Sequence, residues 1–128
     1  MSKMTKAQKR EALRMKFGGR CAYCGTELSA NFHADHVEAI YRDKSEPTGM
    51  QKPENDVPEK LYPACKPCNL FKSVLTLEAF RQEISMQAER AEKYSVNHRT
   101  AKRFGQIEVK TGPVVFWFEQ YQQEGSAA

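Results

Sequence analysis

The sequence lacks the segments that would place a protein in or across a membrane. No apolar run approaches the ~20 residues that a transmembrane helix needs. The first residues lack the apolar stretch of a secretory signal peptide. No internal repeat is visible either. We therefore expect a single-domain protein with no membrane partner, in a cytoplasmic and reducing compartment.

Acidic residues are scarce at the start of the chain, where Glu11 is the one acid among the first twenty residues. The 128 residues carry a net charge of +4, a balance that permits nucleic-acid binding. A solvated helix face explains such a basic run equally well. If nucleic acid is the partner, the candidate contacts in the two basic stretches are Lys9, Arg10, Arg14, Arg99, Lys102 and Arg103.

The first half of the chain has signals for two helices and two strands. Thr5 and Gln8 fit a capping box for a helix over residues 6–16. A strand is expected over residues 31–40, ending near His36, and a second short strand at Leu61 and Tyr62. Between them lies a polar loop with several prolines. Residue 67 is a proline suited to the first turn of a helix that runs to about residue 73.

The second half predicts a helix and a hairpin. Thr76 is a suitable N-cap for a helix over residues 77–94, whose apolar residues recur at helical spacing. Residues 98–103 are interpreted as a basic connector, in which His98 is a phosphate or surface residue. Residues 106–110 and 114–119 predict a β-hairpin. The side chains of Val115, Phe116, Trp117 and Phe118 are expected to pack on the core. Residues 122–128 are expected to be a flexible tail.

Four cysteines form two Cys-x-x-Cys pairs, Cys21 with Cys24 and Cys65 with Cys68. Under reducing conditions such pairs predict a tetrahedral zinc site with four thiolate ligands. Two short disulfides, or a redox-active Cys-x-x-Cys, are the alternatives. A structural zinc would also stabilise a chain of this modest length.

Between and directly after the cysteine pairs stand Asp35, His36 and Asn69. Hydrolysis of a phosphodiester needs a base that activates water and a cation that neutralises the charge developing on the phosphate. A neutral histidine is suited to the first task, while carboxylate and amide oxygens bind hard divalent cations. A zinc ion joining the cysteine pairs would bring Asn69 close to the other two residues. Taken singly, the Asp-His pair and the asparagine fit surface or capping roles equally well.

The ordered motif resembles the HNH endonucleases of the ββα-metal fold. The resemblance runs from about residue 18 to residue 75, through Ala-Asp-His-Val at 34–37 and Leu-Tyr-Pro-Ala-Cys-Lys-Pro-Cys-Asn-Leu-Phe-Lys-Ser at 61–73. It implies a one-metal DNA endonuclease, as encoded by phages or mobile elements, that would act in the host cytoplasm. The products would carry 5′-phosphate and 3′-hydroxyl ends.

The resemblance also assigns roles to residues. His36 would be the general base, and Asp35 and Asn69 would hold one catalytic Mg²⁺ or Mn²⁺. The four cysteines would bind structural zinc, around which Tyr23 and Tyr62 are expected to pack. Lys72 would contact DNA phosphate. His33, which shares the strand face of Asp35, is left as a third ligand, a substrate contact or a partly buried structural histidine.

The chain departs from the family pattern at several positions. Lys60 stands where the family has the asparagine that orients the base histidine; Asn55 is the nearest replacement, or Lys60 itself faces the phosphate. Ala39 stands where a proline is common, the common Gly-Gly is absent, and Asn69 replaces a frequent histidine.

The expected fold is therefore α+β. A ββα-metal core with its structural zinc site (residues 18–75) follows an N-terminal basic helix (1–17) and precedes a C-terminal helix plus β-hairpin (76–121). A DNA endonuclease is the main hypothesis. A zinc-dependent DNA-binding module that does not cut is the first alternative. The second is a zinc-stapled protein-interaction domain that uses the exposed part of residues 114–118 as its contact.

Overall fold

The computed structural model describes residues 3–121, which divide into two compact units. The knuckle unit comprises residues 3–76 and 115–121, and the helical unit comprises residues 77–114. The single nuclease domain expected over residues 1–128 stays a prediction, and the expected tail at 122–128 lies outside the described residues. Within the described chain, the helices are too short or too polar to cross a bilayer.

The knuckle unit begins with α1, Lys6–Arg14, whose start is fixed by its own sequence. The Thr5 hydroxyl accepts the Gln8 N–H at 3.1 Å, and the Gln8 side chain accepts the Thr5 N–H at 2.8 Å. These reciprocal bonds satisfy two backbone donors at the helix end, as the sequence predicts. The helix ends two residues earlier than expected. Turns follow it, with Gly18 and Gly19 at positive φ.

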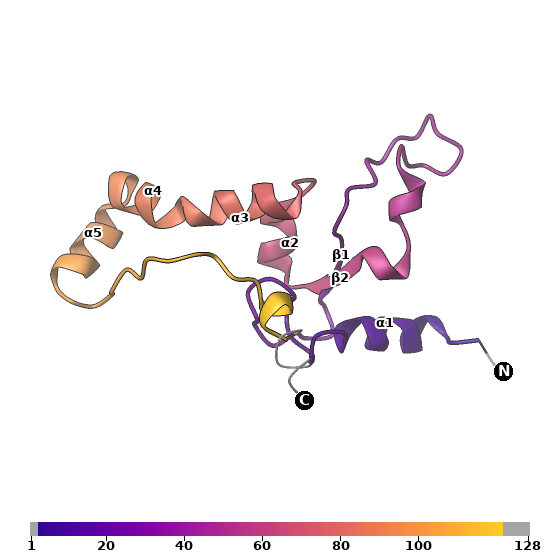
Figure 1. The fold of residues 1–128 in the computed structure, drawn as a ribbon, viewed down its shortest axis with the longest axis horizontal. Helices are drawn as coiled ribbons and strands as arrows, with labels where there is room; N and C mark the ends of the chain where they lie inside the picture. Colours follow the sequence, from indigo (N-terminus) through magenta and orange to yellow (C-terminus); the bar gives the residue numbers. More distant parts are fainter. Residues whose placement is uncertain (1–2, 122–128) are drawn as a thin grey trace. The chain divides into compact units, whose positions relative to one another are not determined.

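The sheet of this unit is a two-stranded antiparallel ribbon. Strand β1, His33–His36, pairs with β2, Leu61–Ala64, so that Asp35 lies opposite Tyr62. Helix α2, Lys66–Lys72, follows β2 directly (Figure 1). Helices and a small antiparallel sheet confirm the α+β class. Strand β1 is shorter than the predicted strand over residues 31–40.

The long connection between the strands carries two short 3₁₀ helices, η1 Pro53–Asn55 and η2 Pro58–Lys60. Asn55 is buried and donates from Nδ2 to the backbone oxygen of Ala39 at 3.0 Å. The connection is therefore an ordered loop held by its own polar contacts.

The core of the knuckle unit is largely aromatic. Five aromatic rings lie in contact, with centroid distances of 4.9 to 6.4 Å between neighbouring rings. They come from both parts of the chain that form this unit. These residues are Phe17, Tyr23, Tyr62, Phe116 and Phe118. Backbone hydrogen bonds join the same segments, because the Trp117 and Phe118 N–H groups donate to the backbone oxygens of Tyr23 and Ala22. The segment after residue 114 is thus packed on the first cysteine turn.

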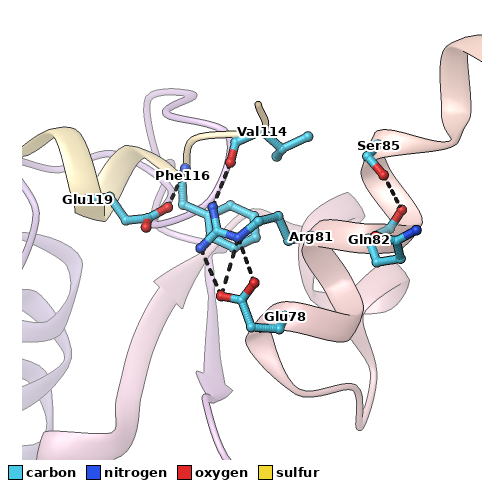
Figure 2. A network of polar contacts seen from close by, with 7 residues as sticks. All are labelled: Glu78, Arg81, Gln82, Ser85, Val114, Phe116 and Glu119. Atoms are coloured by element: carbon cyan, nitrogen blue, oxygen red, sulfur yellow. Dashed lines mark hydrogen bonds and ion pairs between the residues drawn. The ribbon is translucent and has the colours of Figure 1, made fainter. Parts of the chain in front are cut away.

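That packing corrects the predicted hairpin. Residues 106–110 form no strand, and residues 117–121 are helical. The Phe116 N–H donates to Glu119 Oε1 at 2.9 Å (Figure 2), a contact typical of a helix start. Phe116 and Phe118 are buried as predicted, while Val115 is exposed.

The helical unit contains three helices where one helix and a connector were expected. They are α3 Leu77–Ser85, α4 Gln87–Tyr94 and α5 Val96–Arg103. The predicted helix over residues 77–94 is interrupted at Met86, and the basic stretch 98–103 is helical. The Ser95 hydroxyl caps α5 by accepting the His98 N–H at 3.1 Å. A serine cap and good helix formers explain why this stretch is not a connector.

Polar contacts hold the ends of this unit together. Arg81 on α3 pairs with Glu78 one turn earlier, and its Nη1 donates to the backbone oxygen of Val114 at 2.6 Å (Figure 2). Arg81 therefore ties the first helix to the last residue of the unit.

Candidate active site and metal centre

The four cysteines meet although Cys24 and Cys65 are far apart in sequence. The first pair lies in a turn closed by the Gly25 N–H on Cys21 O, with Gly25 at positive φ. In the second pair, Cys65 is the N-cap of α2 and Cys68 lies in its first turn. Their four Sγ atoms all lie within 4.8 Å of one another.

This spacing fits a zinc ion. Ligands about 2.3 Å from a tetrahedral zinc stand about 3.8 Å apart. The Cys24 and Cys65 sulfurs are 3.7 Å apart, too far for a disulfide, and all four cysteines are free. The pKa of Cys21 is lowered, first because Cys68 donates a hydrogen bond to its sulfur, and the pKa of Cys68 is raised by the same bond. Ionisation of a second cysteine beside the Cys21 thiolate is therefore unfavourable unless a cation is present, and a bound zinc ion would supply that charge.

Asp35 and His36 lie side by side on β1 but have different surroundings. The Asp35 carboxylate is buried, accepts the Tyr23 hydroxyl and lies 3.2 Å from Lys72 Nζ. Burial raises the pKa of Asp35, while Tyr23 and Lys72 oppose that shift. Within residues 3–121, the contacts from Tyr23 and Lys72 both use Oδ2 of Asp35. Oδ1 is left for a contact with a bound group.

Lys72 lies in the interior of the knuckle unit. Its side chain is 0% exposed, and Nζ also donates to the backbone oxygen of His36 at 3.1 Å. The prediction that Lys72 contacts DNA phosphate is therefore wrong for this structure, because its ammonium is enclosed between α2 and β1. An ion pair with Asp35 makes that burial tolerable.

His36 has a partner that the sequence did not reveal. Its Nε2 lies 2.9 Å from Asp56 Oδ1, and both side chains remain partly exposed. A carboxylate beside Nε2 favours the tautomer with its proton there, which leaves Nδ1 as an acceptor. Asp56 follows Asn55 in the loop, but an acid in a polar loop has no sequence signal that pairs it with a histidine.

The two candidates for the family's middle position contact each other. Lys60 Nζ donates to Asn55 Oδ1 at 2.8 Å and lies 3.2 Å from Glu38. Neither side chain lines the cavity beside His36. They stabilise the loop, and the contact to the imidazole comes from Asp56.

Asn69 is held by His33. Asn69 Nδ2 lies 2.9 Å from His33 Nδ1, and an amide nitrogen can only donate, so the imidazole nitrogen accepts. This bond turns the amide so that Oδ1 is free for another contact. The structure therefore gives His33 the position of a residue that orients Asn69.

Asp35, His36 and Asn69 line one open cavity of about 470 Å³. The structure thus brings together the three residues that the sequence selects for chemistry. A carboxylate and an amide oxygen are donors that suit Mg²⁺ or Mn²⁺. Lys72 already neutralises part of the Asp35 charge.

Several basic residues predicted to contact DNA have partners within the knuckle unit. The Arg10 guanidinium stacks over Phe32 at 4.0 Å, and Nη2 donates to the Phe32 backbone oxygen at 2.6 Å. Arg14 pairs with Glu11 at 2.7 Å. Lys9 is exposed. Arg10 and Arg14 therefore help to fix α1, whatever else they contact.

Most of the basic residues of α5 that were predicted to contact DNA also have partners within their own unit. Arg99 donates to the backbone oxygens of Glu92 and Lys93, which satisfies carbonyls near the end of α4. Lys102 and His98 both lie near the Glu92 carboxylate. Arg103 is exposed and donates to the Thr100 hydroxyl.

No family model, curated protein or solved structure matches this chain. The resemblance to HNH endonucleases therefore rests on the motif residues of the sequence alone.

Proposed function

We propose that this chain is a metal-dependent DNA endonuclease of the HNH type, with a ββα-metal core and a structural zinc ion. The observation that carries the proposal is the single cavity in which His36, Asp35 and Asn69 meet. Each residue is held by a specific partner, as catalytic groups must be to act without reorganisation.

The zinc ion would be bound by the four cysteines and would join the first cysteine turn to α2. Because Asn69 follows Cys68 directly, a fixed knuckle also fixes Asn69 opposite β1. In this way the structural metal would position a residue of the active site.

His36 would act as the general base. Nδ1 accepts a proton from a water molecule in the cavity, while Asp56 holds the opposite nitrogen and stabilises the imidazolium that forms. The activated water attacks phosphorus, and the bond to the 3′ oxygen breaks. A divalent cation held by Asp35 and Asn69 would neutralise charge on the phosphate and the leaving oxygen.

Plasmid cleavage tests the proposal. Zinc-loaded protein is incubated with supercoiled DNA in buffer with Mg²⁺, with Mn²⁺, or without either, beside His36→Ala and the matched variant His98→Ala. We expect nicked or linear DNA that requires the divalent ion. His36→Ala should lower the rate at least ~100-fold, while His98→Ala cuts normally. Unchanged zinc content shows that the knuckle unit is folded in each variant, and an unchanged far-ultraviolet dichroism spectrum shows that the helices are kept. Cleavage by His36→Ala at the parent rate would exclude this base.

The buried pair of Lys72 and Asp35 favours a second candidate, a DNA-binding module that does not cut. In that case the carboxylate already has its cation, and a divalent ion has no role. The same samples then leave plasmid intact under every metal and still shift DNA in a gel.

The packing of residues 115–118 bears on the third hypothesis, a protein-interaction domain. Phe116 and Phe118 are buried in the aromatic core of their own unit. Only the less buried residues, chiefly Val115, remain for the contact surface proposed for that domain.

A further inference from the structure

Among the described residues that line the cavity beside His36, Arg42 is the one arginine or lysine. Arg42 follows the buried Ile40 and the exposed Tyr41. Within residues 3–121 its guanidinium has no hydrogen bond or ion pair. A cation therefore stands free at the cavity that holds His36.

The backbone at this point is strained. Tyr41 has a φ of 51°, a region that is unfavourable for a non-glycine residue. The loop compensates with backbone bonds, from the Gln51 N–H to Tyr41 O at 2.9 Å and from the Asp43 N–H to Gly49 O at 2.8 Å. Strain that a loop maintains beside a cavity often serves a functional geometry.

The nearest acid in the loop is already engaged. Asp43 accepts the Ser45 hydroxyl and N–H through Oδ1, and the Gln51 amide through Oδ2. These bonds, the Ser45 side-chain bond first, lower the pKa of Asp43. Asp43 is thus a fixed part of the turn and leaves the charge of Arg42 unpaired.

We propose that Arg42 binds the phosphate of the nucleic-acid strand that enters this cavity. The inference rests on the proposed function and adds to it a substrate contact. The fork of an arginine binds two phosphate oxygens at once, which a lysine cannot do. Arg42 takes the role that the sequence assigned to Lys72, whose ammonium is enclosed by α2 and β1.

The test compares Arg42→Ala and Arg42→Lys with Lys44→Ala. Lys44 is an exposed cation of the same loop that does not line the cavity. Binding of a short fluorescein-labelled DNA duplex is measured without divalent ions, over a range of salt concentrations. Cleavage of the same duplex is measured with Mg²⁺.

We expect Arg42→Ala to weaken binding about tenfold and to reduce the slope of log affinity against log salt by about 1. In cleavage it should raise KM more than it lowers kcat. Arg42→Lys should keep the salt slope and lose part of the affinity, because charge remains while the fork is lost. Lys44→Ala should change affinity less than twofold.

Two results would overturn the proposal. One is the same affinity and salt slope for Arg42→Ala and the parent. The other is an equal loss for Arg42→Ala and Lys44→Ala, which would mean that only general charge matters. If the parent binds DNA through Arg42 but cuts under no metal, the endonuclease fails while the phosphate contact stands.

Discussion

The two units of this chain are stabilised in different ways. In the knuckle unit, polar contacts join residues far apart in sequence, such as Lys72 with His36 and Trp117 Nε1 with Phe17 O. In the helical unit most described contacts are local, such as Arg81 with Glu78 and Ser95 with His98.

Single substitutions should therefore change the free energy of unfolding more in the knuckle unit than in the helical unit. The knuckle unit depends on a few buried groups, so the loss of one is costly. Helices with local pairs lose little when one pair is removed.

Zinc removal should have the largest effect, because structural zinc sites contribute about 10–16 kcal/mol of apparent binding energy that is coupled to folding. Chelation should abolish the near-ultraviolet dichroism of the aromatic core, while part of the far-ultraviolet helical signal remains. Cys65→Ser should reproduce the loss without chelator. An aromatic signal that survives complete zinc removal would contradict this dependence.

Lys72→Met should cost about 3–5 kcal/mol, because it leaves the Asp35 carboxylate buried without its cation. Urea unfolding measures the change. Lys66→Met is the matched control, since Lys66 is an exposed residue of the same helix, and it should stay within about 0.5 kcal/mol of the parent. Adding Asp35→Asn to Lys72→Met should recover part of the loss. Equal stability of the two lysine variants would show that the buried pair is not needed.

Glu78→Gln in the helical unit also removes an ion pair, but the Glu78 side chain is 79% exposed. The cost should be only about 0.2–0.5 kcal/mol, because water screens such a pair. Thermal unfolding at low and high salt measures it, and high salt should remove the difference. A loss as large as that of Lys72→Met would refute the contrast between the units.

Alkaline pH should produce the smallest effect. Burial raises the pKa of Tyr62, so the folded state keeps this phenol protonated at a pH where the unfolded chain ionises it. The contribution of Tyr62 is complete below about pH 10 and falls as pH rises above that value. Tyr62→Phe keeps the ring and should show a shallower alkaline fall in melting temperature. Parallel curves for the two proteins would exclude this contribution.

The parts of the fold that the sequence predicts are those with local causes. Thr5 and Gln8 lie within one helical turn, so their capping box needs no distant partner. Each Cys-x-x-Cys pair is likewise a local turn. The position of Asn69 follows from its place directly after Cys68.

Most of the predictions that failed concern features that depend on contacts between residues far apart in sequence. Residues 106–110 and 114–119 have strand-forming side chains, but the aromatic core binds the second segment and no hairpin forms. In the sequence, Lys72 cannot be distinguished from a surface lysine, because its burial depends on the ion pair with the distant Asp35. Met86, where the predicted long helix is interrupted, carries no helix-breaking signal.

The cysteine pairs, the cap of α1 and the order of the Asp-His pair and Asn69 can be predicted from the sequence, because spacing along a chain controls short-range geometry. The contact of Asp56 with His36, the burial of Lys72 and the place of Arg42 in the cavity wall depend on the folded chain. Each of these choices selects one partner among many similar charged residues. Long-range packing makes that selection, and it leaves no periodic trace in the sequence.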